Sequence, residues 1–163
     1  MIAPPNAQAR ILYSAAADPR ALADAALSAP SLAAACALKL DRRSSVHLLP
    51  HSPAGPIVVK TIALRRPKDR LNALLRRTQS QRQIRGAALL QTIGVATAEP
   101  LLLIRGRGRE TLILRAAPGR SLLHLLDALA RKAPDAPTFH QQRAVAAAIG
   151  AALLRFDAAA RFN

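Results

Sequence analysis

The chain has 163 residues, a formal net charge of +15 and a single cysteine, Cys36. This length is enough for one ordinary domain, and one cysteine excludes an internal disulfide and a cysteine-rich zinc module. No apolar stretch approaches the roughly 20 residues that a membrane span requires, and residues 1–38 lack the apolar core of a secretory signal, so we expect a protein of a reducing, cytoplasmic compartment.

The N-terminal third begins with an extension that contains one short helix. Residues 1–19 show little periodicity and are expected to be irregular. Asp18 is a suitable helix N-cap and Pro19 suits the first helical position, so a helix is predicted over Arg20–Ser28. We assign 1–33 as an N-terminal extension.

Three short runs then predict an antiparallel meander. Residues 34–40 alternate with a period of two, which is typical of a strand. Asp41–Ser45 forms a polar turn, and Val46–Leu49 is the second strand. Pro56–Ile62 (PIVVKTI) is the third strand, because it is rich in β-branched residues, and it carries Lys60 near its end.

The middle of the chain concentrates the positive charge. Residues 60–115 hold thirteen basic and three acidic residues, a net charge of +10. Such a block attracts the phosphates of a nucleotide, a nucleic acid or an anionic lipid, although a coding bias towards arginine would produce it without function. Leucines at helical spacing after Arg65 predict a short helix. Ser80 and Gln83 match a capping box, which predicts that a longer helix starts there and ends at Gly94.

The last part of the chain predicts a hairpin followed by helices. Pro100–Ile104 and Glu110–Arg115 read as two strands joined by a tight basic turn. After a linker, a leucine-rich helix is expected over Ser121–Lys132. Thr138 and Gln141 form another capping box at the start of a helix that runs almost to the end. Strands interrupted by one helical region and followed by helices indicate an α+β class.

This order, with a lysine on the third strand, resembles the N-lobe of a protein kinase and the first helices of its C-lobe. The local sequence is similar to the lipopolysaccharide kinase (Kdo kinase) family over about residues 36–163. The segments that carry the resemblance are Leu38-Lys39, Ser44-Ser45-Val46, Pro56-Ile57-Val58-Val59-Lys60, Ala87 to Leu90, Ile93-Gly94-Val95-Ala96-Thr97, Glu99-Pro100-Leu101, Pro118-Gly119-Arg120-Ser121 and Leu153-Leu154-Arg155-Phe156-Asp157.

The resemblance implies a protein-kinase-like N-lobe, a five-stranded antiparallel sheet plus a helix, over 34–115. It also implies a hinge and the truncated start of a C-lobe over 116–163. Lys60 would hold the ATP phosphates, and Ser44 and Ser45 would offer hydroxyl and N–H groups to them. The complete relative would use ATP and magnesium to phosphorylate a core sugar of lipopolysaccharide, in the cytoplasm or at the periphery of the inner membrane.

The chain departs from the family pattern in three ways. The turn over Asp41–Ser45 has no glycine, and residues 70–98 contain no Asp or Glu to pair with Lys60. The family's catalytic loop and its metal-binding residues would begin after Asn163, so no catalytic or metal-binding residue is assigned. We therefore expect a fragment that is inactive without a C-lobe.

Two alternatives stay open. One is a non-catalytic basic module in which Arg65–Arg85 binds nucleic acid or an anionic membrane, although the chain has few aromatic residues for base stacking. The other is a kinase-like scaffold whose apolar C-lobe helices contact a partner chain. The histidines, His47 and His51 among them, do not share a helix face, and a metal site is not expected.

Overall fold

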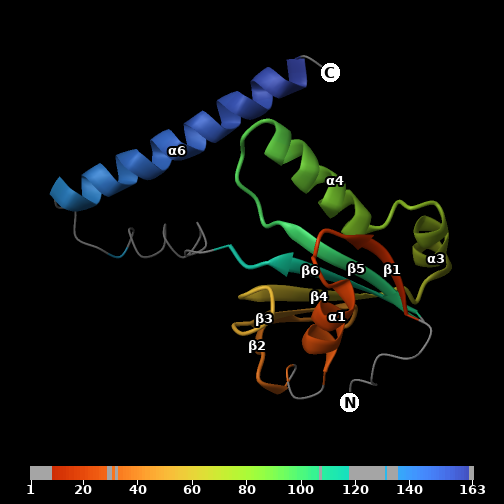
Figure 1. Cartoon of the computed structure of the whole chain (residues 1–163). Coiled ribbons are helices and arrows are strands. Elements are labelled where there is room, and N and C mark those ends of the chain that lie inside the picture. The colour runs from red at the N-terminus through yellow and green to blue at the C-terminus, as the bar shows by residue number, and fades with distance from the viewer. Residues whose placement is uncertain are drawn as a thin grey trace. The chain divides into compact units, whose positions relative to one another are not determined.

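The computed structural model of the chain describes residues 9–28, 31, 33–106, 108–117, 131 and 136–161. The elements of this part are shown in Figure 1. In chain order they are β1 (Arg10–Ser14), α1 (Pro19–Leu27), β2 (Cys36–Leu40), β3 (Ser44–Leu49), β4 (Ile57–Ala63), α3 (Pro67–Leu74), α4 (Gln79–Thr92), β5 (Pro100–Gly106), β6 (Arg109–Arg115) and α6 (Ala136–Arg161). The predicted α+β class is confirmed. The helix expected over Ser121–Lys132 falls almost wholly outside the described residues.

The chain divides into two compact units. The first comprises residues 1–88 and 97–116, and the second comprises 89–96 and 117–163. All six strands, α1 and α3 lie in the first unit, α4 runs from the first into the second, and α6 lies in the second. The segment 1–33, expected as an extension, contributes β1 and α1 to the first unit.

The strands form one antiparallel sheet in the order β1-β5-β6-β4-β3-β2. The predicted meander is present as β2, β3 and β4, and the predicted hairpin as β5 and β6 (Figure 1). The prediction of five strands and of an irregular segment 1–19 was wrong, because Arg10–Ser14 pairs with β5 at the edge of the sheet. Five residues are too few for a clear period-two signal, and the partner strand lies about 90 residues further along the chain.

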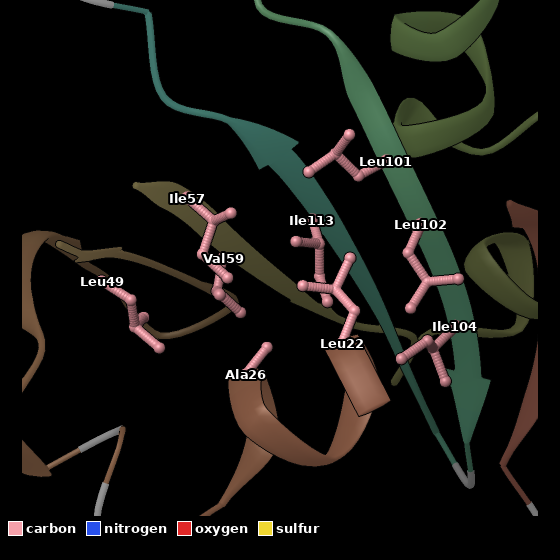
Figure 2. Packing of buried hydrophobic residues seen from close by; sticks show 9 residues of the cluster. All are labelled: Leu22, Ala26, Leu49, Ile57, Val59, Leu101, Leu102, Ile104 and Ile113. Atoms are coloured by element: carbon pink, nitrogen blue, oxygen red, sulfur yellow. The ribbon is translucent and has the colours of Figure 1, made fainter. Parts of the chain in front are cut away.

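One face of the sheet is covered by α1. Leu22 and Ala26 of this helix pack against strand residues that include Ile57, Val59 and Ile113 (Figure 2). The Asp18 carboxylate accepts hydrogen bonds from the backbone N–H groups of Arg20 and Ala21, so the predicted N-cap is confirmed. Capping and burial together fix this short helix on the sheet.

The other face carries a smaller cluster under α4. Leu103, Leu112 and Leu114 are buried there, and Ile84 of α4 packs against them. Strand residues alternate between the two faces, so Val58 and Lys60 point to this side while their neighbours in β4 point towards α1.

The start of α4 differs from the prediction. The helix begins at Gln79, and Thr78 and Gln81 form its capping box, with both hydrogen bonds at 3.3 Å. Ser80 is instead fully buried. The sequence contains two overlapping matches to the capping-box pattern, Thr78–Gln81 and Ser80–Gln83, and the helix uses the first. The Gln83 side chain is therefore free to make a tertiary contact.

Helix α6 begins at Ala136, two residues before the predicted capping position Thr138. Its apolar residues Leu153 and Leu154 are exposed. Within the described part of the chain, no helix has both the length and the apolar character needed to cross a membrane.

Candidate functional site

Lys60 lies in the middle of the sheet, on β4. Its registered partners are Val46 on β3 and Leu112 on β6. The β-branched residues on either side of it, Val59 and Thr61, point to the opposite face. The strand therefore holds the lysine half-buried on the face that α4 covers.

The ammonium group of Lys60 contacts α4 directly. Its Nζ donates a hydrogen bond to Oε1 of Gln83 at 3.2 Å. A lysine ammonium has three N–H donors, and no other described side chain accepts from this one, so two donors remain for a bound anion. The geometry is that of a cation held by a neutral partner.

Sequence reasoning missed Gln83 as the partner of Lys60. The kinase-like pattern calls for a carboxylate, which residues 70–98 lack, and the sequence places Gln83 in a capping box with Ser80. The signal that would have found it is the helical position: in a helix capped by Thr78, Gln83 comes after the first turn and lies on a different side from Gln81.

The environment lowers the pKa of Lys60 below its ordinary value of 10.5. Partial burial is the larger cause, because it disfavours the charged form, and the nearby positive charge of Lys39 is the second. Both lysines are registered with Val46, which lies between them. Lys39 itself forms an exposed ion pair with Asp41 at 3.3 Å.

Ser44 and Ser45, the two serines predicted to contact ATP, point to opposite faces of the sheet. Ser44 is on the same face of the sheet as Lys60, whereas the side chain of Ser45 points to the α1 face. The N–H and hydroxyl of Ser44 are already hydrogen bonded to the Asp41 carboxylate, at 2.6 and 2.9 Å. A phosphate above this turn would therefore have to displace Asp41. The serine contacts with ATP stay a prediction.

The Asp41 carboxylate is held in place within the turn between β2 and β3. The backbone N–H groups of Arg43 and Ser44 hold the pKa of its carboxyl well below its usual range. The carboxylate is therefore charged at neutral pH. It accepts hydrogen bonds from the backbone N–H groups of Arg43 and Ser44, which a glycine-rich loop would leave free to bind phosphate.

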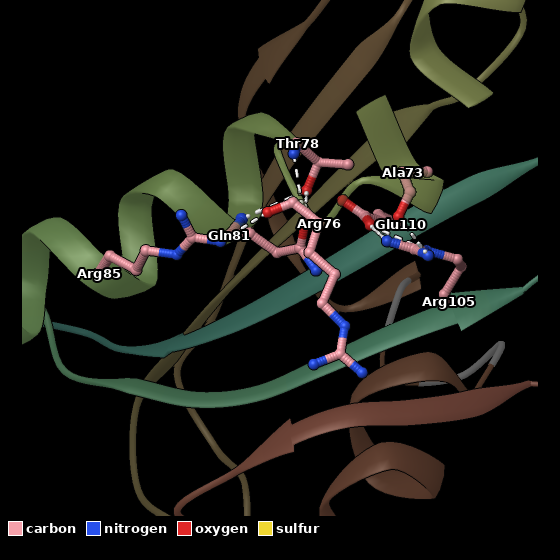
Figure 3. A network of polar contacts seen from close by, with 7 residues as sticks. All are labelled: Ala73, Arg76, Thr78, Gln81, Arg85, Arg105 and Glu110. Atoms are coloured by element: carbon pink, nitrogen blue, oxygen red, sulfur yellow. Dashed lines mark hydrogen bonds and ion pairs between the residues drawn. The ribbon is translucent and has the colours of Figure 1, made fainter. Parts of the chain in front are cut away.

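A second charged cluster lies under the end of α3 and the start of α4 (Figure 3). Arg105 of β5 donates from Nε and Nη2 to Oε1 of Glu110, which is fully buried, and from Nη1 to the Ala73 carbonyl at 3.0 Å. Arg85 of α4 donates to the Arg76 carbonyl at 2.6 Å. These contacts tie the end of α3 to the sheet and the α3–α4 connection to α4.

The remaining acids near the basic segment have structural partners. Asp69 accepts a hydrogen bond from the backbone N–H of Arg66, and Glu99 pairs with Arg115 at 2.7 Å. The described residues contain no group of three or more potential metal ligands. The structure therefore offers no second partner for Lys60 among these carboxylates.

A scan of protein-family models, a search of curated proteins and a search of solved structures each found no match.

Proposed function

We propose that the six-stranded domain is a kinase-like nucleotide-binding lobe in which Lys60 contacts the phosphates of ATP. The observation that carries this proposal is the hydrogen bond between Lys60 on a central strand and Gln83 on α4. In protein kinases the phosphate-binding lysine lies on the third strand and is oriented by a side chain of the helix that follows. Without the edge strand β1, Lys60 lies on the third strand, and α4 precedes the next strand in sequence.

The order of the strands supports the same proposal. The meander β2-β3-β4 is extended by β6 and then β5, so the hairpin that follows α4 in sequence joins β4 through its second strand. This connection brings α4 across the face of the sheet that carries Lys60. The lysine thus has a fixed position and two spare donors, as a contact to an α- or β-phosphate requires.

The reaction that we propose for the complete protein is transfer of the γ-phosphoryl group of ATP, with magnesium, to a hydroxyl of a lipopolysaccharide core sugar. The family resemblance carries the acceptor and the metal. Lys60 would hold the nucleotide, and the base and the metal ligands would come from a further lobe, because no residue of this chain is assigned to those roles. Gln83 lacks the charge of a carboxylate, so we expect weak ATP binding.

ATP binding to the full chain tests the nucleotide part of the proposal. Titration calorimetry should give a saturable signal that Lys60→Met weakens about tenfold or more, as expected for the loss of a charge-assisted hydrogen bond. Lys68→Met removes the same charge from an exposed position on α3 and should change the dissociation constant by less than about twofold. Equal affinities for the two variants would reject Lys60 as the phosphate contact.

The rival function is a basic module that binds nucleic acid, which the net charge of +10 over residues 60–115 favours. Binding to the phosphate backbone of nucleic acid weakens linearly in log salt, with a slope set by the number of phosphates neutralised. A steep slope that Lys60→Met leaves unchanged would favour this module over the nucleotide site.

A further inference from the structure

A cavity lies beside α4, and neither Lys60 nor Gln83 lines it. Its volume is about 440 Å³, within the range of small-molecule sites. Strands β1 and β5 line one side, and the end of α3, the connection to α4 and the first turns of α4 line the other. Gln81, Ile84 and Arg85 face it from α4, whereas Gln83 points to Lys60 from the opposite side of the same helix. All lining residues belong to the first unit.

Four arginines line this cavity and no carboxylate does. They are Arg10, Arg76, Arg85 and Arg105, which together we call the arginine pocket. Arg105 is neutralised by Glu110, and Arg85 is fixed by the Arg76 carbonyl. The guanidinium groups of Arg10 and Arg76 have no hydrogen-bond or ion-pair partner among the described residues. Two engaged arginines therefore frame the cavity, and two free ones are available to a ligand.

The backbone at Arg76 supports a role for its side chain. Arg76 has φ +53°, in the left-handed region that glycine adopts at least cost. An arginine there is strained by about 1 kcal/mol relative to glycine. In Figure 3 its guanidinium extends away from Arg85 and makes no drawn contact, while its carbonyl receives the Arg85 hydrogen bond. The connection is thus held in a shape that presents a free guanidinium.

Apart from the arginines and Gln81, the lining is mostly apolar. Leu12, Tyr13, Ile84 and Leu103 belong to the cluster packed between α4 and the sheet, and they also line the cavity. A ligand that fills it would place an anionic group against the arginines and a compact apolar group against this cluster.

We propose that the arginine pocket binds a phosphate monoester that carries a small apolar substituent, with Arg10 and Arg76 contacting the phosphate directly. A phosphate monoester presents three terminal oxygens and close to two negative charges, so it can accept from two guanidinium groups at once. A carboxylate has two oxygens and one charge, and it would leave one of the free arginines without a counter-charge. The site is separate from Lys60, and the proposal does not rest on the proposed function.

The test uses phenyl phosphate as the probe and titration calorimetry of the full chain as the readout. Phenyl phosphate should bind in a saturable manner, about tenfold more tightly than inorganic phosphate, because its ring is removed from water. Arg76→Gln and Arg10→Gln should each weaken binding about tenfold or more. Arg77→Gln and Arg82→Gln remove the same charge from exposed neighbours that do not line the cavity, and each should change affinity by less than about twofold. An equal loss in all four variants, or equal affinities for the two probes, would overturn the proposal.

Two further variants separate binding from folding and from the nucleotide site. Arg76→Gly relieves the positive φ, so it should raise the melting temperature or leave it unchanged and still weaken phenyl phosphate binding about tenfold or more. Lys60→Met should leave phenyl phosphate affinity unchanged. If Arg76→Gly binds as tightly as the wild type, or if Lys60→Met abolishes binding, the ligand is not in the arginine pocket.

Discussion

At the scale of single residues, the decisive feature is how Lys60 is held. The strand holds the side chain half-buried, the Gln83 amide oxygen accepts one hydrogen bond from its ammonium group, and Lys39 adds a like charge nearby. A carboxylate at position 83 would neutralise the lysine, whereas the amide leaves its charge uncompensated. The folded chain therefore contains a lysine whose protonated form is disfavoured, and this has a measurable consequence for stability.

We predict that stability rises with pH as Lys60 loses its proton. Its pKa is lowered in the folded state and is 10.5 when exposed, so between the two values the unfolded chain binds more protons. Below the pKa of the folded state, the free-energy cost of burying the protonated lysine is fully present. Above 10.5 this cost has vanished, because the lysine is neutral in both states. Urea unfolding at a series of alkaline pH values should show a steeper rise in the free energy of unfolding for the wild type than for Lys60→Met. Lys68→Met should follow the wild type, and parallel curves for all three proteins would contradict the burial argument.

At the scale of elements, strong local signals were read correctly and non-local contacts were not. Asp18 and Pro19 mark the start of α1, and the β-branched run around Lys60 marks β4, because the residues that determine these elements are adjacent in sequence. Strand β1 was missed because only its pairing with β5 makes it a strand. The Lys60–Gln83 contact was missed for the same reason. It joins residues 23 positions apart, and the side of α4 on which Gln83 lies depends on where that helix begins.

The helix start offers a direct test of the corrected capping assignment. Thr78→Ala removes the hydroxyl that receives the Gln81 N–H and should lower the free energy of unfolding by about 1 kcal/mol. Thr78→Ser should recover part of this loss. Ser80→Ala removes a buried hydroxyl that has no hydrogen-bond partner among the described residues, so it should be neutral or stabilising. Urea unfolding of the three variants measures these differences, and a larger loss for Ser80→Ala than for Thr78→Ala would restore the original assignment.

At the scale of the whole molecule, the net charge of +15 should make stability depend on salt. Like charges repel in the compact state, and added salt screens them, so the melting temperature should rise with sodium chloride. If salt acts only by screening surface charges, the melting temperature depends on ionic strength alone. If a specific anion-binding site is present, the melting temperature also depends on which anion is added. At matched ionic strength, sodium phosphate should therefore raise the melting temperature further than sodium chloride does.

The variants distinguish specific binding from the general stabilising effect of phosphate on folded proteins. Arg77→Gln changes the net charge by one and keeps the arginine pocket, so the extra stabilisation by phosphate should persist. Arg76→Gln makes the same change in charge within the pocket, so the extra stabilisation should shrink, because a ligand that binds only the folded state stabilises it in proportion to RT ln(1 + [L]/Kd). If the two variants lose the extra stabilisation equally, the positive charge acts as a diffuse field, and the cavity beside α4 contributes nothing specific to anion binding.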